Sequence, residues 1–209
     1  MNFCSDNVSG VSTEIFDALT RANDGAAMPY GDDQLTERLR QRFNDIFEAE
    51  VAVFPVATGT AANALSLATI TPPHGAIFCH EESHAWDDEC GAPEFYSGAK
   101  LVPLPGSHAK FTPATLEEAL GRFQIGNVHH VQPATVTLTQ ATESGTIYST
   151  DEIQNISALC HTRGLKLHMD GARFANALVT MGCSPADASW RLGLDVLSFG
   201  ATKNGALAA

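Results

Sequence analysis

The fold is decided by the stretch from Ser149 to Asp170, which reads STDEIQNISALCHTRGLKLHMD. Its first four residues have the spacing of a capping box, in which a serine and a glutamate three positions later close the amino end of a helix. Gly164 suits the end of that helix, because glycine adopts a left-handed conformation at low cost. The mainly apolar residues from Leu165 to Met169 predict a strand that ends at Asp170. The stretch therefore indicates one helix–strand unit of an α/β protein.

The alternation of helices and strands continues on both sides of this unit. Apolar spacing and capping residues predict helices at 13–25, 33–48 and 61–70. Short apolar or β-branched runs predict strands at 76–79, 100–104, 135–139 and 196–199, and a strand or extended segment at 51–56. This order predicts a three-layer α/β/α fold with a mostly parallel central sheet. Ligands of such sheets bind beyond the carboxyl ends of the strands.

The amino-acid composition of the chain limits the kinds of molecule that it is expected to bind. The 209 residues are 44% hydrophobic, enough for one sizeable core, and the formal net charge of -12 would repel nucleic acid. The five cysteines are irregularly spaced, which indicates reduced thiols in a cytoplasmic protein. The start lacks the pattern of a signal peptide, and no apolar run reaches the roughly 18 residues of a membrane span. We therefore expect neither nucleic acid nor a membrane as a partner.

Two side chains follow the last two predicted strands, Asp170 and Lys203. A lysine amine forms an imine with the aldehyde of pyridoxal 5′-phosphate, and a carboxylate keeps the pyridine nitrogen of that cofactor protonated. Small residues around the lysine, Gly200 and Ala201 among them, leave room for a ring. The ordinary alternatives are an exposed lysine and a helix-capping aspartate. The pair predicts pyridoxal phosphate as the cofactor.

Three further residues are candidates for the same site. Gly59 and Thr60 open a predicted helix, whose first N–H groups suit a phosphate. Arg173 carries a planar guanidinium that suits a carboxylate or a cofactor oxygen, with a structural ion pair as its alternative.

Two histidines and a tyrosine have less specific patterns. His84 is predicted to stack its ring on the cofactor, and His130, or His129 beside it, to handle a substrate proton. Tyr30 lies in a predicted turn, from which its phenol would reach a site, if need be in a partner subunit. For each of them the alternative is an ordinary loop or turn residue.

His80-Glu-Glu-Ser-His84 matches the zinc peptidase motif letter for letter. That motif requires a helix that sets both imidazoles on one face. Here His80 directly follows a predicted strand, so no helical turn precedes it. We therefore expect no metal site, and we keep a zinc metallopeptidase as an alternative from another functional class.

Taken together, several stretches resemble one known family in chain order: Ser5-Asp-Asn7, Tyr30-Gly-Asp-Asp33, Thr58-Gly-Thr-Ala-Ala-Asn63, His84, Asp87-Asp-Glu-Cys-Gly-Ala-Pro-Glu-Phe95, Thr139-Gln-Ala-Thr-Glu143, His168-Met-Asp-Gly-Ala-Arg-Phe174 and Ser198-Phe-Gly-Ala-Thr-Lys-Asn-Gly205. They resemble the low-specificity L-threonine aldolases, fold-type I pyridoxal phosphate enzymes of the β-eliminating lyase group. The stretch from Asp87 to Phe95 is similar to the bacterial branch also described as L-allo-threonine or phenylserine aldolases.

This resemblance implies roles for the residues of the cofactor site. Lys203 would hold the cofactor covalently, Asp170 would face the pyridine nitrogen, and His84 would stack on the ring. The phosphate would be held by Gly59 and Thr60 together with Thr202.

The resemblance also implies the substrate contacts and the assembly. Ser5 and Arg173 would bind the substrate carboxylate, while His84 and His130 would lie near the β-hydroxyl. Tyr30 would reach across a dimer interface in a homotetramer, a dimer of dimers.

The implied activity is retro-aldol cleavage of L-threonine, L-allo-threonine and related β-hydroxy-α-amino acids to glycine and an aldehyde. The alternatives are β-elimination by another fold-type I lyase and a non-catalytic domain that keeps the scaffold. We expect an amino-terminal segment at 1–25 and a cofactor-binding large domain at 26–209. The small carboxyl-terminal domain implied by the resemblance would lie beyond this sequence.

Overall fold

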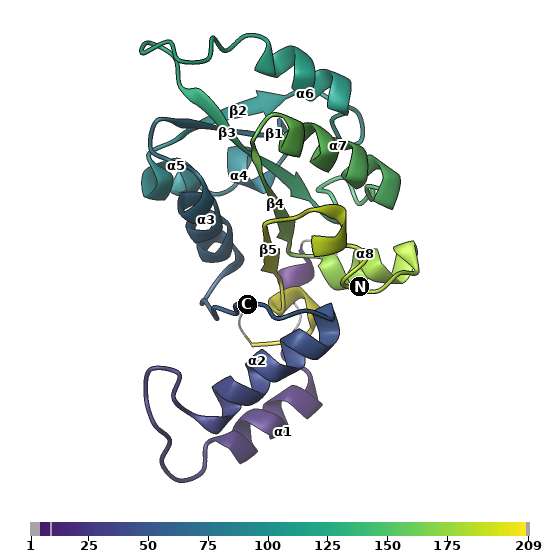
Figure 1. Cartoon of the computed structure of the whole chain (residues 1–209). Helices are drawn as coiled ribbons and strands as arrows, with labels where there is room; N and C mark the ends of the chain where they lie inside the picture. Colours follow the sequence, from purple (N-terminus) through teal and green to yellow (C-terminus); the bar gives the residue numbers. More distant parts are fainter. Residues whose placement is uncertain (1–4, 9, 208–209) are drawn as a thin grey trace.

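The computed structural model describes residues 5–8 and 10–207, and Cys4 lies outside them. Its centre is a five-stranded sheet in the order β2-β1-β3-β4-β5, in which every described pair of strands is parallel (Figure 1). The strands are β1 (Gly75–His80), β2 (Lys100–Leu104), β3 (Gln132–Thr139), β4 (Lys166–Gly171) and β5 (Val196–Phe199). The predicted α/β fold with a parallel sheet is therefore confirmed.

Helices cover both faces of the sheet, which gives three layers (Figure 1). One face carries α3 (Gly59–Ile70), α4 (His84–Asp87) and α5 (Ala92–Ser97). The other carries α6 (Pro113–Leu120), α7 (Thr150–Thr162) and α8 (Phe174–Met181). The described residues also contain three 3-10 turns: η1 (Asp6–Val8), η2 (Trp190–Leu192) and η3 (Thr202–Asn204).

The two faces of the sheet differ in character, because strand side chains alternate between them. Leu167 and Met169 of β4 belong to the larger core beneath α6 and α7. The intervening His168 and Asp170 face α3, where the apolar cluster is small and centred on Leu67 and Ile77. The α3 face is thus the one on which the sheet buries polar side chains.

The helix–strand unit from Ser149 to Asp170 forms as predicted. Ser149 Oγ accepts a hydrogen bond from the Glu152 backbone N–H (3.2 Å), and the Glu152 carboxylate accepts one from the Ser149 N–H (2.7 Å). Gly164 follows α7 with a φ of +69°, which only glycine adopts without strain. The chain can therefore turn directly into β4.

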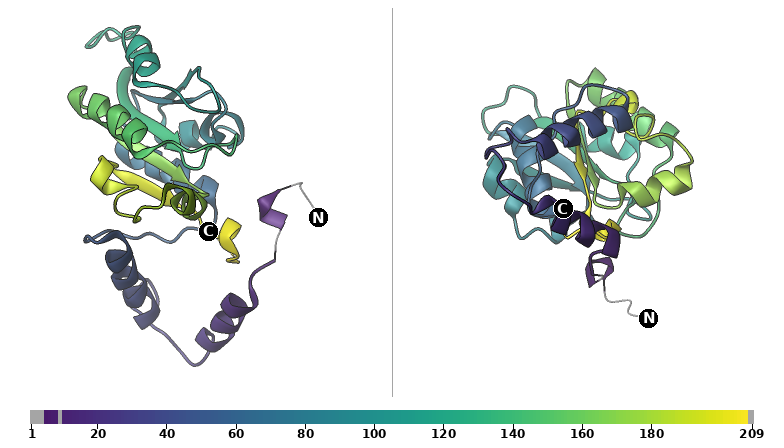
Figure 2. Two further views of the ribbon diagram at one scale, coloured as in Figure 1. Left: turned by 90° about the vertical axis from the view of Figure 1, so that its right-hand side faces the viewer. Right: turned by 90° about the horizontal axis from the view of Figure 1, so that it is seen from below.

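Helices α1 (Thr13–Ala22) and α2 (Gln34–Phe47) project from the body as a pair (Figure 2). The carboxyl end of α2 is anchored by aromatic contacts: Phe43 and Phe47 pack against Phe199, with ring centroids 5.4 and 6.3 Å away. Helix α1 buries none of its residues. The predicted division at residue 25 falls in the connection between the two helices, and it stays a prediction.

For residues 51–56 we expect a strand or an extended segment, and the structure contains no strand there. The backbone N–H of Val51 donates to the Asn44 side chain instead of to a neighbouring strand (2.9 Å), and Phe54 is 81% exposed. An apolar run alone does not supply the pairing partner that a strand requires.

Two further findings concern the composition of the chain. In the described residues, Cys79, Cys90, Cys160 and Cys183 are free thiols. Nowhere in residues 5–8 and 10–207 is there a helix with the length and hydrophobicity needed to cross a membrane.

Candidate functional site

Two hydrogen bonds fix the direction of the Asp170 carboxylate. Asp170 lies near the carboxyl end of β4, is 6% exposed, and uses both carboxylate oxygens. One accepts a hydrogen bond from the Ala172 backbone N–H (3.0 Å), and the other from the Asn63 amide of α3 (2.8 Å). These bonds set the direction of the carboxylate at the edge where ligands of parallel sheets bind.

Behind Asp170, a buried histidine joins three strands. The His168 ring is hydrogen-bonded to Thr137 of β3 (2.8 Å) and to Ser198 of β5 (2.9 Å). Burial lowers the pKa of His168 to about 4, although the charge of Asp170 acts in the opposite direction. The ring is therefore neutral near pH 7 and does not act as a cation for Asp170. Its two hydrogen bonds link β4 to the neighbouring strands β3 and β5.

Arg173 and Lys203 meet at one carboxylate. Asp6 of η1 accepts a hydrogen bond from Arg173 Nε (2.6 Å), and its other oxygen lies 3.7 Å from Lys203 Nζ. Burial raises the pKa of Asp6, but the Arg173 hydrogen bond and the charges of Arg173 and Lys203 outweigh it and lower the pKa overall. A guanidinium and an amine thus lie within reach of a single anionic group.

Two glycines allow the ends of β4 and β5 to approach closely. A Cβ on Gly171 would lie 2.6 Å from the Ser198 carbonyl oxygen, and one on Gly200 would lie 2.5 Å from the Ala172 carbonyl oxygen. Neither contact is sterically possible, so only glycine fits at these positions. Their close approach brings the segments that carry Asp170, Arg173 and Lys203 to one edge of the sheet.

The predicted phosphate contacts lie in two short segments. Gly59 and Thr60 form the first turn of α3, where the Thr58 hydroxyl accepts the Ala61 N–H (3.1 Å). A Cβ on Gly59 would meet no atom within 4 Å, so the backbone there is open to a ligand. Thr202 opens η3, immediately before Lys203.

The chemistry of these residues fits pyridoxal phosphate. The edge offers a buried carboxylate for a ring nitrogen, a lysine whose side chain is 13% exposed, and a helix amino end for a phosphate. In the described part of the chain, the buried polar atoms of this region that have no partner include Asn63 Oδ1, Glu89 Oε2 and Glu143 Oε2.

His84 lies at the same edge, at the start of α4 after β1. Its backbone N–H donates to Glu143 (2.9 Å), which also accepts from Thr139 at the end of β3 (3.0 Å). The imidazole Nε2 lies 3.9 Å from the Asp88 carboxylate, and the side chain is 38% exposed. The ring is thus accessible for stacking, on a backbone that Glu143 holds in place.

The zinc alternative lacks the helix that its motif requires. His80 is the buried last residue of β1, whereas His84 belongs to α4. Residues 5–8 and 10–207 contain no group of three histidine, cysteine or acidic side chains arranged to hold a metal ion.

Within this chain His130 lies away from the residues described above, and its predicted role near the β-hydroxyl stays a prediction. It precedes β3, near the amino end of the sheet, where Gln132 N–H donates to the His74 carbonyl. Asp170 lies at the carboxyl end of the neighbouring strand. The sequence order of strand and loop already separates these ends, because all the strands run in the same direction.

Besides Arg173, two further predicted substrate contacts, Ser5 and Tyr30, are exposed. Ser5 directly precedes Asp6, and its hydroxyl accepts the Asn7 N–H (3.1 Å). Tyr30 is 100% exposed in the connection between α1 and α2, away from the sheet (Figure 1). Tyr30 is therefore not brought to the site of its own chain.

Four residues at this edge have no role predicted from the sequence: Asp6, Asn63, Glu89 and Glu143. All four lie inside stretches that carry the family resemblance, which is the one available signal. Their contacts join residues far apart in the sequence, so spacing alone does not reveal them.

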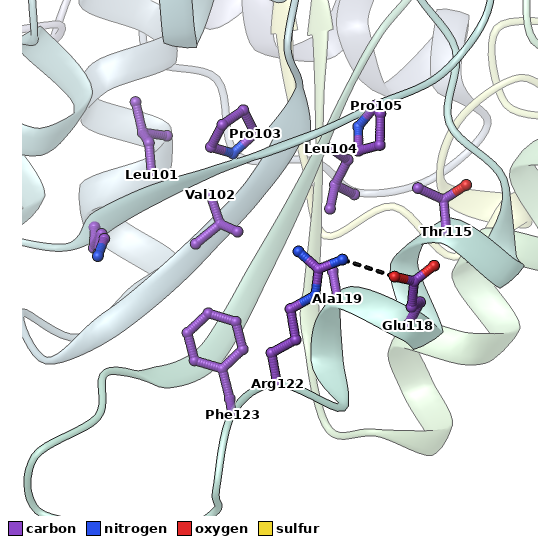
Figure 3. Close-up of a pocket in the computed structure, with 11 residues that line it drawn as sticks. Leu101, Val102, Pro103, Leu104, Pro105, Thr115, Glu118, Ala119, Arg122 and Phe123 are labelled. Carbon is purple, nitrogen blue, oxygen red and sulfur yellow. Dashed lines mark hydrogen bonds and ion pairs between the residues drawn. The ribbon is translucent and has the colours of Figure 1, made fainter.

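A separate pocket lies between β2 and α6 (Figure 3). Helix α6 covers the larger core, so this pocket lies on the opposite face of the sheet from Asp170. It is lined by Val102, Leu104 and Phe123, and the Arg122–Glu118 ion pair (2.7 Å) lies beside it. It contains none of the predicted site residues.

Comparisons with known proteins identify relatives of this chain. The chain is 48% identical over 204 residues to the low specificity L-threonine aldolase of Pseudomonas aeruginosa, which covers 97% of this chain and 58% of that relative. The chain therefore spans about three fifths of the length of this relative and of a second low specificity L-threonine aldolase from a Pseudomonas species.

Solved structures confirm the predicted fold. A threonine aldolase of Leishmania major superimposes with a TM-score of 0.90 at 31% identity, covering 97% of this chain and 58% of that one. The aspartate aminotransferase of Thermus thermophilus, at 14% identity and a TM-score of 0.56, covers 78% of this chain and 42% of its own, and shares the fold alone. The family model of the beta-eliminating lyases matches residues 2–208. The chain belongs to the beta-eliminating lyase family.

Proposed function

We propose that the protein uses pyridoxal phosphate to cleave L-threonine, L-allo-threonine and related β-hydroxy-α-amino acids to glycine and an aldehyde. One observation carries this proposal: Arg173 and Lys203 both reach one carboxylate, that of Asp6. An α-amino acid needs this arrangement, with a guanidinium for its carboxylate and a lysine close to its amino group. The names of the relatives support the choice of substrate class.

The cofactor would be held by residues of three segments. Lys203 binds it covalently, Asp170 pairs with its ring nitrogen, and His84 stacks on its ring. The phosphate lies against Gly59 and Thr60, with Thr202 beside it. When bound, pyridoxal phosphate supplies a conjugated ring that takes up the electrons of the broken bond.

The substrate would be oriented by its carboxylate. Arg173 binds that carboxylate through its planar fork, with the Ser5 hydroxyl beside it, so the substrate displaces Asp6 from the guanidinium. His84 accepts the proton of the β-hydroxyl, and its position is set by the bond between its backbone N–H and Glu143. The Asn63 and Ala172 N–H groups keep the Asp170 carboxylate in place throughout.

We place the protein in a homo-oligomer, a dimer of dimers, in which the fully exposed Tyr30 contacts the site of a neighbouring subunit. The large exposed side chains Phe95 (81%) and Tyr96 (60%) of α5 support a contact surface between copies. A cytoplasmic location is supported by the free thiols of the described cysteines.

The test is a spectrum and a product analysis of the full chain with pyridoxal phosphate. Wild-type protein should gain a visible absorbance band and convert threonine to equimolar glycine and acetaldehyde. Lys203→Ala should lose the band while remaining folded by far-ultraviolet circular dichroism. Formation of 2-oxobutanoate and ammonia instead of glycine would reveal β-elimination, and an unchanged band in Lys203→Ala would refute the role of the lysine.

A further inference from the structure

Glu89 is a buried acid that the proposed reaction does not use. It lies between α4 and α5, is 4% exposed, and directs one carboxylate oxygen to the Asn63 amide (2.8 Å). Its other oxygen is buried and has no partner in the described residues. An acid in such a position needs a reason, because burying an unpaired carboxylate is costly.

Asn63 connects Glu89 to the cofactor site. Its amino group donates one hydrogen to Glu89 Oε1 and the other to Asp170 Oδ2, both at 2.8 Å. An amide nitrogen has two hydrogens, so these two acceptors use both and fix the rotation of the side chain. If Glu89 were absent, only the bond to Asp170 would hold the amide.

We propose that Glu89 is a positioning residue, which in its neutral form locks the Asn63 amide so that this amide holds Asp170 in line with the ring nitrogen of the cofactor. This inference rests on the proposed function, because it assumes that Asp170 faces a pyridine nitrogen. Glu89 itself touches neither cofactor nor substrate in this assignment.

Below a pH of about 7, the surroundings of Glu89 favour its neutral form. Burial raises its pKa to about 7, the Asn63 hydrogen bond acts against that, and the facing groups Asp170 and Glu143 add to the rise. Both facing groups are acidic, so ionised Glu89 would repel Asp170 across the shared amide. A neutral acid can accept from Asn63 without this repulsion.

The test compares two substitutions in the full chain. Glu89→Ala removes the acceptor, so the dissociation constant of pyridoxal phosphate should rise about tenfold, the loss of one buried hydrogen bond. The visible circular dichroism of the bound cofactor should weaken with it. Glu89→Gln keeps the acceptor and lacks the charge, so both readouts should stay near wild type. Glu94→Ala, an exposed acid of α5, is the matched control.

The outcomes separate the two proposals. If wild type binds no pyridoxal phosphate, the proposed function fails, and the inference with it. If wild type binds it but Glu89→Ala is unchanged, only the positioning role is refuted. If Glu89→Gln behaves like Glu89→Ala, Glu89 acts through its charge, and the neutral lock is refuted.

A second measurement does not depend on how Glu89→Ala folds. Infrared difference spectra of the wild-type full chain without cofactor should contain the band of a protonated carboxylic acid at pH 6. Glu89→Gln should lack that band. A spectrum of Glu89→Gln identical to that of wild type would refute the neutral form of Glu89.

Discussion

Glu89 and Asp170 both accept a hydrogen bond from the Asn63 amide. The raised pKa of Glu89 should appear in the pH dependence of the unfolding free energy. A carboxyl whose pKa is raised on folding binds its proton more strongly in the native state, so it stabilises that state at low pH. This contribution is lost as the pH rises from the ordinary pKa of 4.5 to the raised value of about 7.

Glu89→Gln should therefore become more stable relative to wild type as the pH rises. The difference in unfolding free energy between the two proteins should increase by up to about 3 kcal/mol between pH 4.5 and pH 8. Urea denaturation of the full chain at both pH values measures it. Glu94→Gln, an exposed acid nearby, should have no such trend, and a flat difference for Glu89→Gln would contradict the raised pKa.

At the scale of the elements, the ends of β4 and β5 determine where the site residues lie. Gly171 has no side chain, and its carbonyl accepts a hydrogen bond from the Gly200 N–H (3.1 Å). The chain then leaves β5 toward η3, which carries Thr202 and Lys203 and packs against η1. A disturbance at Gly200 should therefore reach the lysine.

Gly200→Ala should lower both stability and cofactor binding. Its Cβ would overlap the backbone of Ala172, which cannot yield as a flexible side chain can. We expect a loss of about 1–3 kcal/mol in unfolding free energy, the usual cost of overpacking, and a weaker visible band at limiting pyridoxal phosphate. Gly121→Ala, where the nearest atom is 3.4 Å from the new Cβ, is the control. Equal behaviour of the two variants would show that the close approach is dispensable.

Helices and strands were easier to predict from the sequence than the tertiary contacts between them. Capping residues and β-branched runs act locally, so the strands at 100–104 and 196–199 are confirmed to the residue. Residues 51–56 form no strand, because strand formation depends on a neighbour that the local sequence does not contain. The role predicted for His130 stays a prediction: the residue precedes β3, and residue chemistry alone does not tell at which end of the sheet a histidine lies.

Across the whole molecule, the site depends on contacts between distant parts of the chain. Asn63 is 26 residues from Glu89 and 107 from Asp170. Only the folded sheet brings these residues together, which is why the sequence suggested Asp170 and Lys203 but gave no role to the amide between the two acids.

Exposed apolar side chains on helices α5 and α3 support the proposed homo-oligomer. Helix α5 exposes Phe95 and Tyr96, whose rings pack edge to face with centroids 5.2 Å apart. Helices α3 and α5 pack together, and Leu65 of α3 is 46% exposed. Such a group of exposed apolar side chains is typical of an interface.

Phe95→Asp should therefore reduce the mass of the full-chain assembly, because a charge would be buried between copies. Analytical ultracentrifugation measures the change. Val128→Asp, at a loop position that is 91% exposed, should leave the mass unchanged. A wild-type protein that sediments as a single copy would contradict the proposed oligomer.

The pairing of Asp6 with Arg173 spans 167 residues. A ribosome releases the amino-terminal segment early, yet the partner of Asp6 emerges only after most of this sheet has been synthesised. Arg173 directly follows β4, so we expect η1 to dock only after β4 has been synthesised. During translation, η1 therefore docks late, and the site is completed near the end of the synthesis of this part of the chain.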